Sequence, residues 1–282
     1  MASAEVLENL TKVGVVRDDL IFDVGMNACE DTDYFLAKGF EVVAVDANPA
    51  VCRAAEKRYA AEIASGRLTV LNRAISLSRE PLTFWVCTSY SAWSTASPKL
   101  RDFWSAQGAT FEEIEVQGAT TADVVEAHGV PYYAKIDIEG YDLICLKGFA
   151  PDAAPTYASV EVDLAAVDEL LSTAEALGYR RFELRSQSKV PEQRPPVPAL
   201  EGASIDYRFE VGSSGLFGRE ITAEWLDAAT LRARCRRIID QHRLGGALTR
   251  VASLTPFGEA AADFKRKRLP LSNDWYDVHM RR

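Results

Sequence analysis

Acidic residues end four apolar runs of the 282-residue sequence, and this placement is its first indication of chemistry. The four are Asp23, Asp46, Asp137 and Glu161, each of which follows residues typical of a buried strand. Open α/β sheets bind ligands at the carboxyl ends of their parallel strands, so we expect these acids to lie along one edge of a sheet. Each acid alone is weak evidence, because acids at strand ends also cap the helices that follow.

The run from Leu20 to Asn27 indicates a strand that leads through a glycine turn into a helix. Asp46 follows at the distance of one β-α-β unit, whose second strand supplies a carboxylate to a ribose diol. The turn has one glycine, Gly25, where a dinucleotide fingerprint needs three, and the sequence has no Gly-Lys-Ser/Thr phosphate loop. The pattern favours a nucleoside without phosphates, such as S-adenosylmethionine (SAM). An ordinary α/β crossover with two exposed acids is the alternative.

Apolar periodicity and turn residues predict an α/β fold in which strands alternate with helices. Residues 186–203 hold four prolines, too many for a regular element, so we expect a surface loop there. Strands are predicted over residues 20–24, 41–46, 68–75, 82–87, 132–137, 157–163, 180–185 and 206–211, the last of these being the final strand. Helices are predicted over residues 32–38, 49–65, 121–128, 142–147, 165–177 and 223–243.

The composition is that of an ordinary globular protein, with 48% hydrophobic and 26% charged residues, and it allows a sizeable core. No internal repeat or long linker divides the chain. We therefore expect a single domain over residues 1–282, with insertions around 81–117 and 186–220 and a C-terminal helical and tail extension over 221–282.

The formal net charge of −9 disfavours nucleic acid as a partner, because it repels a phosphate backbone. The basic run at residues 265–268 is interpreted as a solvated face. The five cysteines are scattered, with no Cys-x-x-Cys or zinc-type spacing, which suits a reducing cytoplasm. No stretch has the length of a membrane span or the apolar region of a signal peptide, so we expect a cytoplasmic protein without a membrane partner.

An aromatic, hydroxyl-rich stretch at residues 89–95 follows the predicted strand over 82–87. Loops that follow strand ends tend to carry function, so this stretch could form a wall of a substrate site. Trp93 and Trp104 could equally be core anchors of an insertion, and the sequence leaves both interpretations open.

Three segments together resemble the FkbM family of SAM-dependent methyltransferases: residues 23–32, 43–49 and, above all, 135–140, Lys-Ile-Asp-Ile-Glu-Gly. Residues 157–161, 212–218 and 275–279 also resemble segments of one bacterial branch of that family. The chain departs from the family pattern at Ala28-Cys29, where many members have a glycine, and at Asp46, where glutamate is common.

The resemblance implies a class I, Rossmann-like fold: a mostly parallel seven-stranded sheet with helices on both faces. It also implies SAM as cofactor and methylation of a hydroxyl on a sugar, polyketide or other small natural product. It assigns Asp23, Gly25 and Asn27, together with Thr32 of the same motif, to the methionine side of SAM. It assigns Asp46 and Ala47 to the ribose, Asn72, Arg73 and Ala74 to the adenine side, and Asp137 to the methyl group.

Methyl transfer from a sulfonium needs alignment, exclusion of water and, for a weakly acidic hydroxyl, a base. Asp137 is the first candidate for that acid or base, and Glu139 follows it closely in the sequence. No metal is needed for this chemistry. Asp137 and Glu139 could hold a magnesium ion against the acceptor, but two acids alone are a sparse oxygen site, so no metal is expected.

Residues 275–279 combine two aromatic residues, an acid and His279, a composition expected of a docked segment rather than a frayed end. Imidazole accepts a hydroxyl proton well near neutral pH. One hypothesis is that Trp275 anchors the tail over the ligand edge and that His279 faces the acceptor. The alternative is a tail that packs on the back of the domain or on another subunit of a homo-oligomer.

Two other functional classes stay open. The fold could use SAM for aminocarboxypropyl transfer or cyclise it, because a fold alone does not determine the reaction. It could also be a non-catalytic SAM-binding protein.

Overall fold

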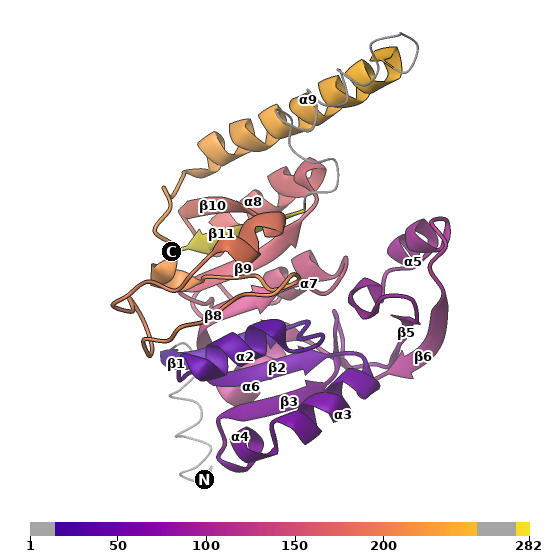
Figure 1. Ribbon diagram of the computed structural model, residues 1–282. Coiled ribbons are helices and arrows are strands. Elements are labelled where there is room, and N and C mark those ends of the chain that lie inside the picture. The colour runs from indigo at the N-terminus through magenta and orange to yellow at the C-terminus, as the bar shows by residue number, and fades with distance from the viewer. Residues whose placement is uncertain (1–14, 253–274) are drawn as a thin grey trace.

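The computed structural model describes residues 15–252 and 275–282, and a seven-stranded sheet forms its centre (Figure 1). The strand order is β10-β11-β9-β8-β1-β2-β3, and within this sheet only β11 pairs antiparallel with its neighbours. This confirms the predicted α/β fold with a mostly parallel sheet. The strands are β1 (Val16–Val24), β2 (Glu41–Asp46), β3 (Leu68–Asn72), β8 (Val130–Ile136), β9 (Tyr157–Val162), β10 (Arg181–Ser186) and β11 (Tyr276–Arg281).

Helices cover both faces of the sheet, because its central strands bury apolar side chains on each side. Phe22 of β1 joins one core and its neighbour Ile21 joins the other. The Ile21 side is covered by α2 (Glu30–Ala37), α3 (Pro49–Arg58) and α4 (Ala60–Ala64), with residues 190–217 over the far half. The Phe22 side is covered by α6 (Thr121–His128), α7 (Asp142–Lys147), α8 (Val167–Ala176) and α9 (Ala228–Ala252).

Helix starts follow the capping residues in the sequence. Asn48 accepts a hydrogen bond from the amide of Ala50 at the start of α3, and Pro49 is its first residue. Thr120 and Asp123 form a capping box at the start of α6. The predicted bounds of α6 are therefore confirmed. Those of α7 are confirmed as well, although its N-cap, Tyr141, makes no side-chain cap. The single predicted helix over 49–65 is divided near Tyr59 into α3 and α4.

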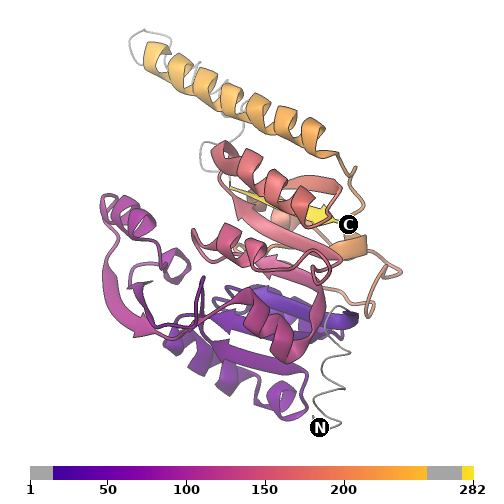
Figure 2. The ribbon, with the colours of Figure 1, turned by 180° about the vertical axis from the view of Figure 1, so that it is seen from behind.

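A lobe stands beside the sheet and is formed by residues 82–116 (Figures 1 and 2). It contains the antiparallel pair β5 (Leu82–Cys87) and β6 (Phe111–Val116), a 3-10 helix (Ser91–Trp93) and α5 (Pro98–Ser105). The predicted strand over 68–75 is divided, because β4 (Ala74–Ile75) leaves the main sheet to pair with β7 (Gly118–Ala119). That small pair marks where the chain enters and leaves the lobe.

The C-terminal strand corrects one prediction. Residues 206–211 form no strand, and the final strand of the sheet is β11, which lies between β9 and β10. Its residues Tyr276, Val278 and Met280 all point into the apolar core on the Phe22 side. Phe209, by contrast, packs its ring against Tyr34 of α2 without backbone pairing. The C-terminal segment is thus part of the sheet rather than an appended tail.

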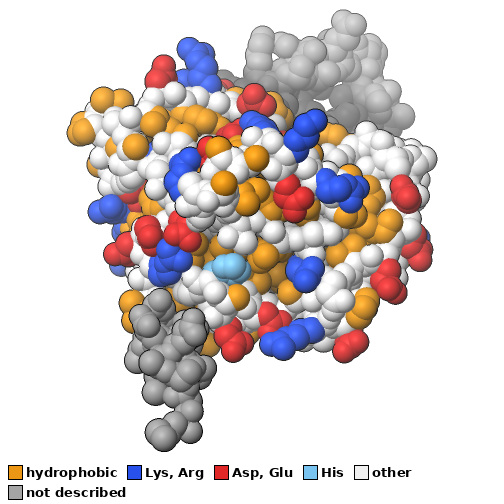
Figure 3. Space-filling view, turned by 90° about the horizontal axis from the view of Figure 1, so that it is seen from below, with side chains coloured by type: hydrophobic (Ala, Val, Ile, Leu, Met, Phe, Trp, Pro, Cys, Tyr) orange, Lys and Arg blue, Asp and Glu red, His pale blue; other side chains and the backbone are white. Residues whose placement is uncertain are grey.

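Surface charge and helix composition relate to two partners that the sequence disfavours, nucleic acid and a membrane. On α9, Arg232 and Arg236 form ion pairs with Asp168 of α8. Acidic and basic side chains are interspersed on the face seen in Figure 3. The basic run at 265–268 lies outside the described residues. Within the described ranges, no helix combines the length and apolar character needed to cross a bilayer.

Candidate active site

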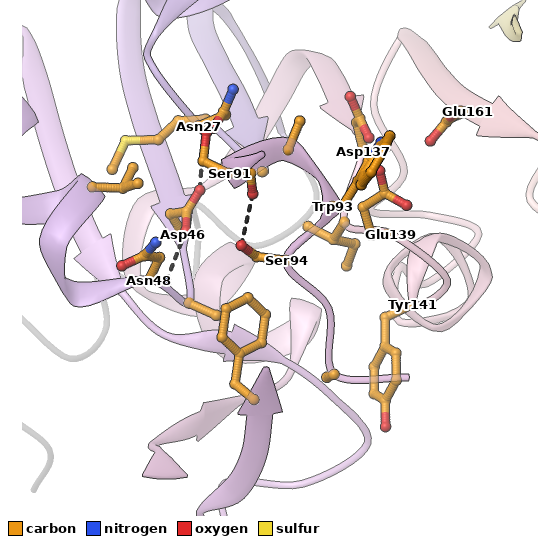
Figure 4. A pocket seen from close by; sticks show the side chains of 18 of the residues that line it. Asn27, Asp46, Asn48, Ser91, Trp93, Ser94, Asp137, Glu139, Tyr141 and Glu161 are labelled. Atoms are coloured by element: carbon orange, nitrogen blue, oxygen red, sulfur yellow. Dashed lines mark hydrogen bonds between the residues drawn. The ribbon is translucent and has the colours of Figure 1, made fainter. Parts of the chain in front are cut away.

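A cavity of about 830 Å³ opens at the carboxyl ends of β1, β2, β8 and β9, between the sheet and the lobe (Figure 4). Small-molecule sites commonly measure ~300–1,000 Å³, so this cavity lies in the upper part of that range. Tyr90, Trp93 and Trp104 of the lobe line it, and the rings of Trp93 and Trp104 stack with centroids 4.2 Å apart. The aromatic stretch is therefore a wall of the cavity.

Gly25 brings the ends of three strands together. Its amide donates a hydrogen bond of 2.8 Å to Val45 O of β2, and the Asp137 amide donates one of 2.9 Å to Val24 O. The backbone of Gly25 has φ +89°, and a Cβ atom there would lie 1.7 Å from the carbonyl oxygen of Asp137. Only glycine allows the backbone at Asp137 to come this close to the turn after β1. Gly25 therefore sets the distance between that turn and the segment that follows β8.

The close approach predicts an unequal cost for two alanine substitutions. Gly39 has the same left-handed backbone, with φ +92°, but no atom lies within 4 Å of an added Cβ. Both alanines carry the left-handed cost of ~1–2 kcal/mol. Gly25→Ala should therefore lower the free energy of unfolding by about 2 kcal/mol more than Gly39→Ala, since it also overpacks the turn. Urea unfolding measures both, and equal losses would contradict the contact between the turn and β8.

Asp46 is held at the end of β2 by two backbone donors. Its Oδ2 accepts a hydrogen bond of 3.0 Å from the Asn27 amide, and its Oδ1 accepts one of 2.8 Å from the Asn48 amide. Burial raises the pKa of Asp46 to about 6, although these hydrogen bonds oppose the shift. Asp46 and Ala47 both line the cavity, so the carboxylate is fixed in orientation and still faces the cavity.

Asn72 was expected on the adenine side of SAM, but its side chain contacts the backbone after β2 instead. Its amide nitrogen donates to the carbonyl oxygens of Asp46 and Ala47, at 3.0 and 3.1 Å, and the residue does not line the cavity. It fixes the turn after β2 from behind. Arg73 and Ala74, the other two residues expected on the adenine side, do line the cavity.

Asn27 connects the Gly25 turn to the lobe. It has φ 42°, and its Oδ1 accepts a hydrogen bond of 2.9 Å from the Ser91 hydroxyl. Ser91 belongs to the 3-10 helix of the lobe, and both side chains appear in Figure 4. This bond holds the wall of the cavity against the glycine turn.

Asp23 and Thr32 lie behind the cavity rather than in its lining. Both are fully buried, and the Thr32 hydroxyl donates a 2.5 Å hydrogen bond to Asp23 Oδ2. Asp23 Oδ1 lies 3.6 Å from the ammonium of Lys135, which lines the cavity. Of the four residues expected at the methionine side of SAM, Asp23 contacts Lys135 and Thr32 contacts Asp23, whereas Gly25 and Asn27 line the cavity.

Lys135 is a buried cation that the sequence did not single out as a site residue. Its ammonium donates a 2.6 Å hydrogen bond to Gly25 O and lies 3.6 Å from Asp137 and 3.9 Å from Asp31. Burial alone would lower the pKa of Lys135, but Asp137, Asp23 and Asp31 raise it well above its ordinary value. One positive charge is therefore shared among three carboxylates.

The acidic end of the cavity combines Asp137, Glu139 and Glu161, all of which line it (Figure 4). One carboxylate oxygen from each lies within 4.8 Å of the others. Burial, followed by repulsion from Asp137, raises the pKa of Glu139 and of Glu161 well above the ordinary range. Asp142 shapes the turn, because its oxygens accept hydrogen bonds of 2.8 and 2.9 Å from the Ile138 and Gly140 amides. Glu161 was visible in the sequence as a strand-end acid but was not assigned to the site.

His279 does not lie where the hypothesis placed it. It pairs with Ser159 and Glu183 in the middle of β11, is 1% exposed and does not line the cavity. Burial, together with Arg185, lowers its pKa well below the ordinary value. Trp275, just before β11, does reach the cavity lining. The tail is docked, but as a strand that holds the imidazole inside the sheet.

Comparison with known proteins gives one match in sequence and several in structure. The model of the methyltransferase FkbM domain matches residues 23–181. A precorrin-6y C5,15-methyltransferase from Geobacter metallireducens GS-15 is similar in structure, with TM-score 0.36, 13% identity, 66% of this chain and 77% of that chain covered. A SAM-dependent methyltransferase from Thiobacillus denitrificans, in complex with S-adenosyl-L-homocysteine, has TM-score 0.30 and 10% identity, with 99% and 92% covered. A comparison with curated proteins gives no match.

Proposed function

Because the chain belongs to the methyltransferase FkbM family and is thus a SAM-dependent methyltransferase, we propose that it methylates a hydroxyl oxygen of a small molecule such as a sugar or polyketide. The observation that carries the proposal is that one cavity has two chemically different ends. A fixed carboxylate, Asp46, lies at one end, and the acids around Asp137 lie at the other (Figure 4).

The residues around Asp46 suit a nucleoside. The Asp46 carboxylate can accept both ribose hydroxyls, because each of its oxygens keeps a lone pair beyond its backbone donor. Arg73 and Ala74 form the wall on which the adenine would lie, and Ala47 borders the ribose. Gly25 and Asn27 would border the methionine part.

The residues around Asp137 suit the acceptor. SAM supplies a methyl group on a positively charged sulfur. The acceptor oxygen forms the new bond to the methyl carbon, the carbon–sulfur bond breaks, and its electron pair stays on sulfur. Asp137 orients the hydroxyl and takes its proton, and Glu139 borders the same space. Trp93 and Trp104 exclude water and offer an apolar surface to a sugar or polyketide.

Asp46→Ala tests the cofactor assignment. The substitution removes charge-assisted hydrogen bonds to the ribose, so SAM affinity should fall by about 1.5–3 kcal/mol, or roughly 10- to 150-fold. Isothermal titration calorimetry measures the affinity. Asp152→Ala is a matched control, because Asp152 is exposed and does not line the cavity. Unchanged SAM affinity in a folded Asp46→Ala protein would contradict the ribose assignment.

The pKa of Asp46 adds a pH dependence to SAM binding. Its carboxylate accepts ribose hydrogen bonds when it is charged, and its pKa is raised to about 6 by burial. SAM affinity should therefore weaken as the pH falls through about 6 and should level off above it. In Asp46→Asn, this step in the pH profile should disappear. A profile of the same shape in both proteins would assign the titration to another group.

A further inference from the structure

The acidic end of the cavity has the geometry of a cation site. Asp137 follows β8, Glu139 lies in the turn after it, and Glu161 lies near the end of the neighbouring strand β9. Their oxygens come within 4.8 Å of one another. Two oxygens on opposite sides of one hard divalent cation lie about 4.2 Å apart for Mg²⁺ and about 4.6–5.2 Å for Ca²⁺. The three carboxylates are thus spaced to share one ion.

A fourth carboxylate lies near this cluster on a different strand. Asp277 of β11 pairs with Glu161 in the antiparallel ladder, so the two side chains lie on the same face of the sheet. Asp277 is only 5% exposed. Among the described residues its carboxylate makes no hydrogen bond or ion pair, and Lys135 attracts it only at longer range. A buried acid without a hydrogen-bond or ion-pair partner is costly, and here it lies beside a second acid, Glu161.

The neighbouring cations are engaged elsewhere. Lys135 contacts Gly25, Asp23, Asp31 and Asp137. Arg185 lies opposite Asp277 in the ladder, but its guanidinium contacts Glu183 and Gln193.

Glu139 and Glu161 likewise make no ion pair with any side chain in residues 15–242 and 275–282. Among the described side chains, these four carboxylates are therefore balanced by no more than a share of the charge on Lys135.

We propose that Asp137, Glu139 and Glu161 bind a hard divalent cation, such as Mg²⁺, Mn²⁺ or Ca²⁺, with Asp277 adding negative charge behind Glu161. The sequence alone assigned two acids to this end of the cavity, too few for an oxygen site. The pairing of β8 with β9 brings Glu161 beside them, and the pairing of β9 with β11 places Asp277 next to Glu161.

The role of the cation rests on the proposed methyl transfer. A cation at this end of the cavity binds the acceptor through its oxygens and lowers the pKa of the reacting hydroxyl. This favours an acceptor with two neighbouring oxygen atoms, as in a sugar diol, because two oxygens can then occupy adjacent coordination positions.

Direct binding of Mn²⁺ to the full chain, without SAM or acceptor, tests the proposal. Electron paramagnetic resonance measures free Mn²⁺, and Mg²⁺ and Ca²⁺ are added as competitors. We expect one site per chain. Glu161→Gln and Glu139→Gln should each weaken Mn²⁺ binding roughly tenfold or more. Glu56→Gln on the exposed face of α3 is the matched control and should leave binding unchanged.

Absence of Mn²⁺ binding by the parent, or equal binding by the parent and both glutamine variants, overturns the proposal. Thermal melting checks that each variant is folded. Because Glu139 lies in a turn and Glu161 in a strand, one variant remains informative if the other fails to fold. Binding of methylammonium in place of Mn²⁺, lost in Glu161→Gln, also overturns it and indicates an acceptor amine.

Calorimetry with SAM separates this result from the proposed function. SAM binding that persists without metal binding would leave the methyltransferase in place and remove the cation site. Metal binding without SAM binding would do the reverse.

Discussion

Asp137→Asn should lower the rate of methyl transfer by about 10²- to 10⁴-fold while changing SAM affinity by no more than about threefold. The amide keeps the shape of the side chain but cannot accept the proton of the acceptor hydroxyl. It also loses the negative charge that Asp137 places 3.6 Å from Lys135. The measurements are single-turnover transfer to a pool of hydroxylated acceptors and calorimetric titration with SAM.

Asp163→Asn is the control for that substitution, because Asp163 directly follows β9 of the same sheet but does not line the cavity. It should keep both the rate and the affinity. If Asp137→Asn lost rate and SAM affinity to the same extent, Asp137 would be a ligand of the cofactor only.

Lys38→Met should lower the free energy of unfolding by about 3–5 kcal/mol, because it leaves a buried carboxylate without its cation. Lys38 of the α2 C-cap lies 2.6 Å from Glu220, and both side chains are 0% exposed. The Tyr34 hydroxyl donates a second hydrogen bond, of 2.5 Å, to the same carboxylate. These contacts attach the segment around residue 220 to α2. Helix α2 follows the Gly25 turn and covers the Ile21 side of the sheet. Denaturant unfolding measures the loss.

Lys147→Met is the matched control. Lys147 also lies 2.7 Å from a glutamate, Glu169, but both side chains are about half exposed, at 49% and 61%. An exposed pair contributes only ~0–1 kcal/mol, so this variant should lose little stability. The double variant Lys38→Met with Glu220→Gln should recover part of the loss, because it removes both charges. Equal losses for Lys38→Met and Lys147→Met would contradict the buried pair.

The sequence predicted local elements well where capping residues and apolar periodicity agreed. Helices α6 and α7 have the predicted bounds, since their starts and ends depend on neighbouring residues. The final strand was assigned wrongly to residues 206–211, because strand formation depends on pairing with distant residues. The alternation of apolar Tyr276, Val278 and Met280 was the signal for β11, and a sheet with an open place between β9 and β10 was needed to interpret it.

The sequence predicted part of the candidate site, as it predicted part of the fold. Asp46 and Asp137 line the cavity as strand-end acids should, whereas Asp23 ends a strand equally well and is buried behind it. Whether a strand-end carboxylate faces the cavity or is buried behind it depends on the neighbouring strands. The side-chain amide of Asn72 donates to backbone oxygens of Asp46 and Ala47, and no local sequence pattern predicts these contacts. Asp277 could not be foreseen, because its proximity to Glu161 depends on the antiparallel insertion of β11.

Mass spectrometry of the nucleoside product tests directly whether the protein transfers the methyl group of SAM to a hydroxyl oxygen. The protein is incubated with SAM labelled in its methyl group and with a pool of sugars and polyketides that carry free hydroxyls. We expect S-adenosylhomocysteine as the nucleoside product and the label on an oxygen of one acceptor. Formation of 5′-methylthioadenosine, which aminocarboxypropyl transfer would leave, or full recovery of tightly bound SAM would contradict this proposal.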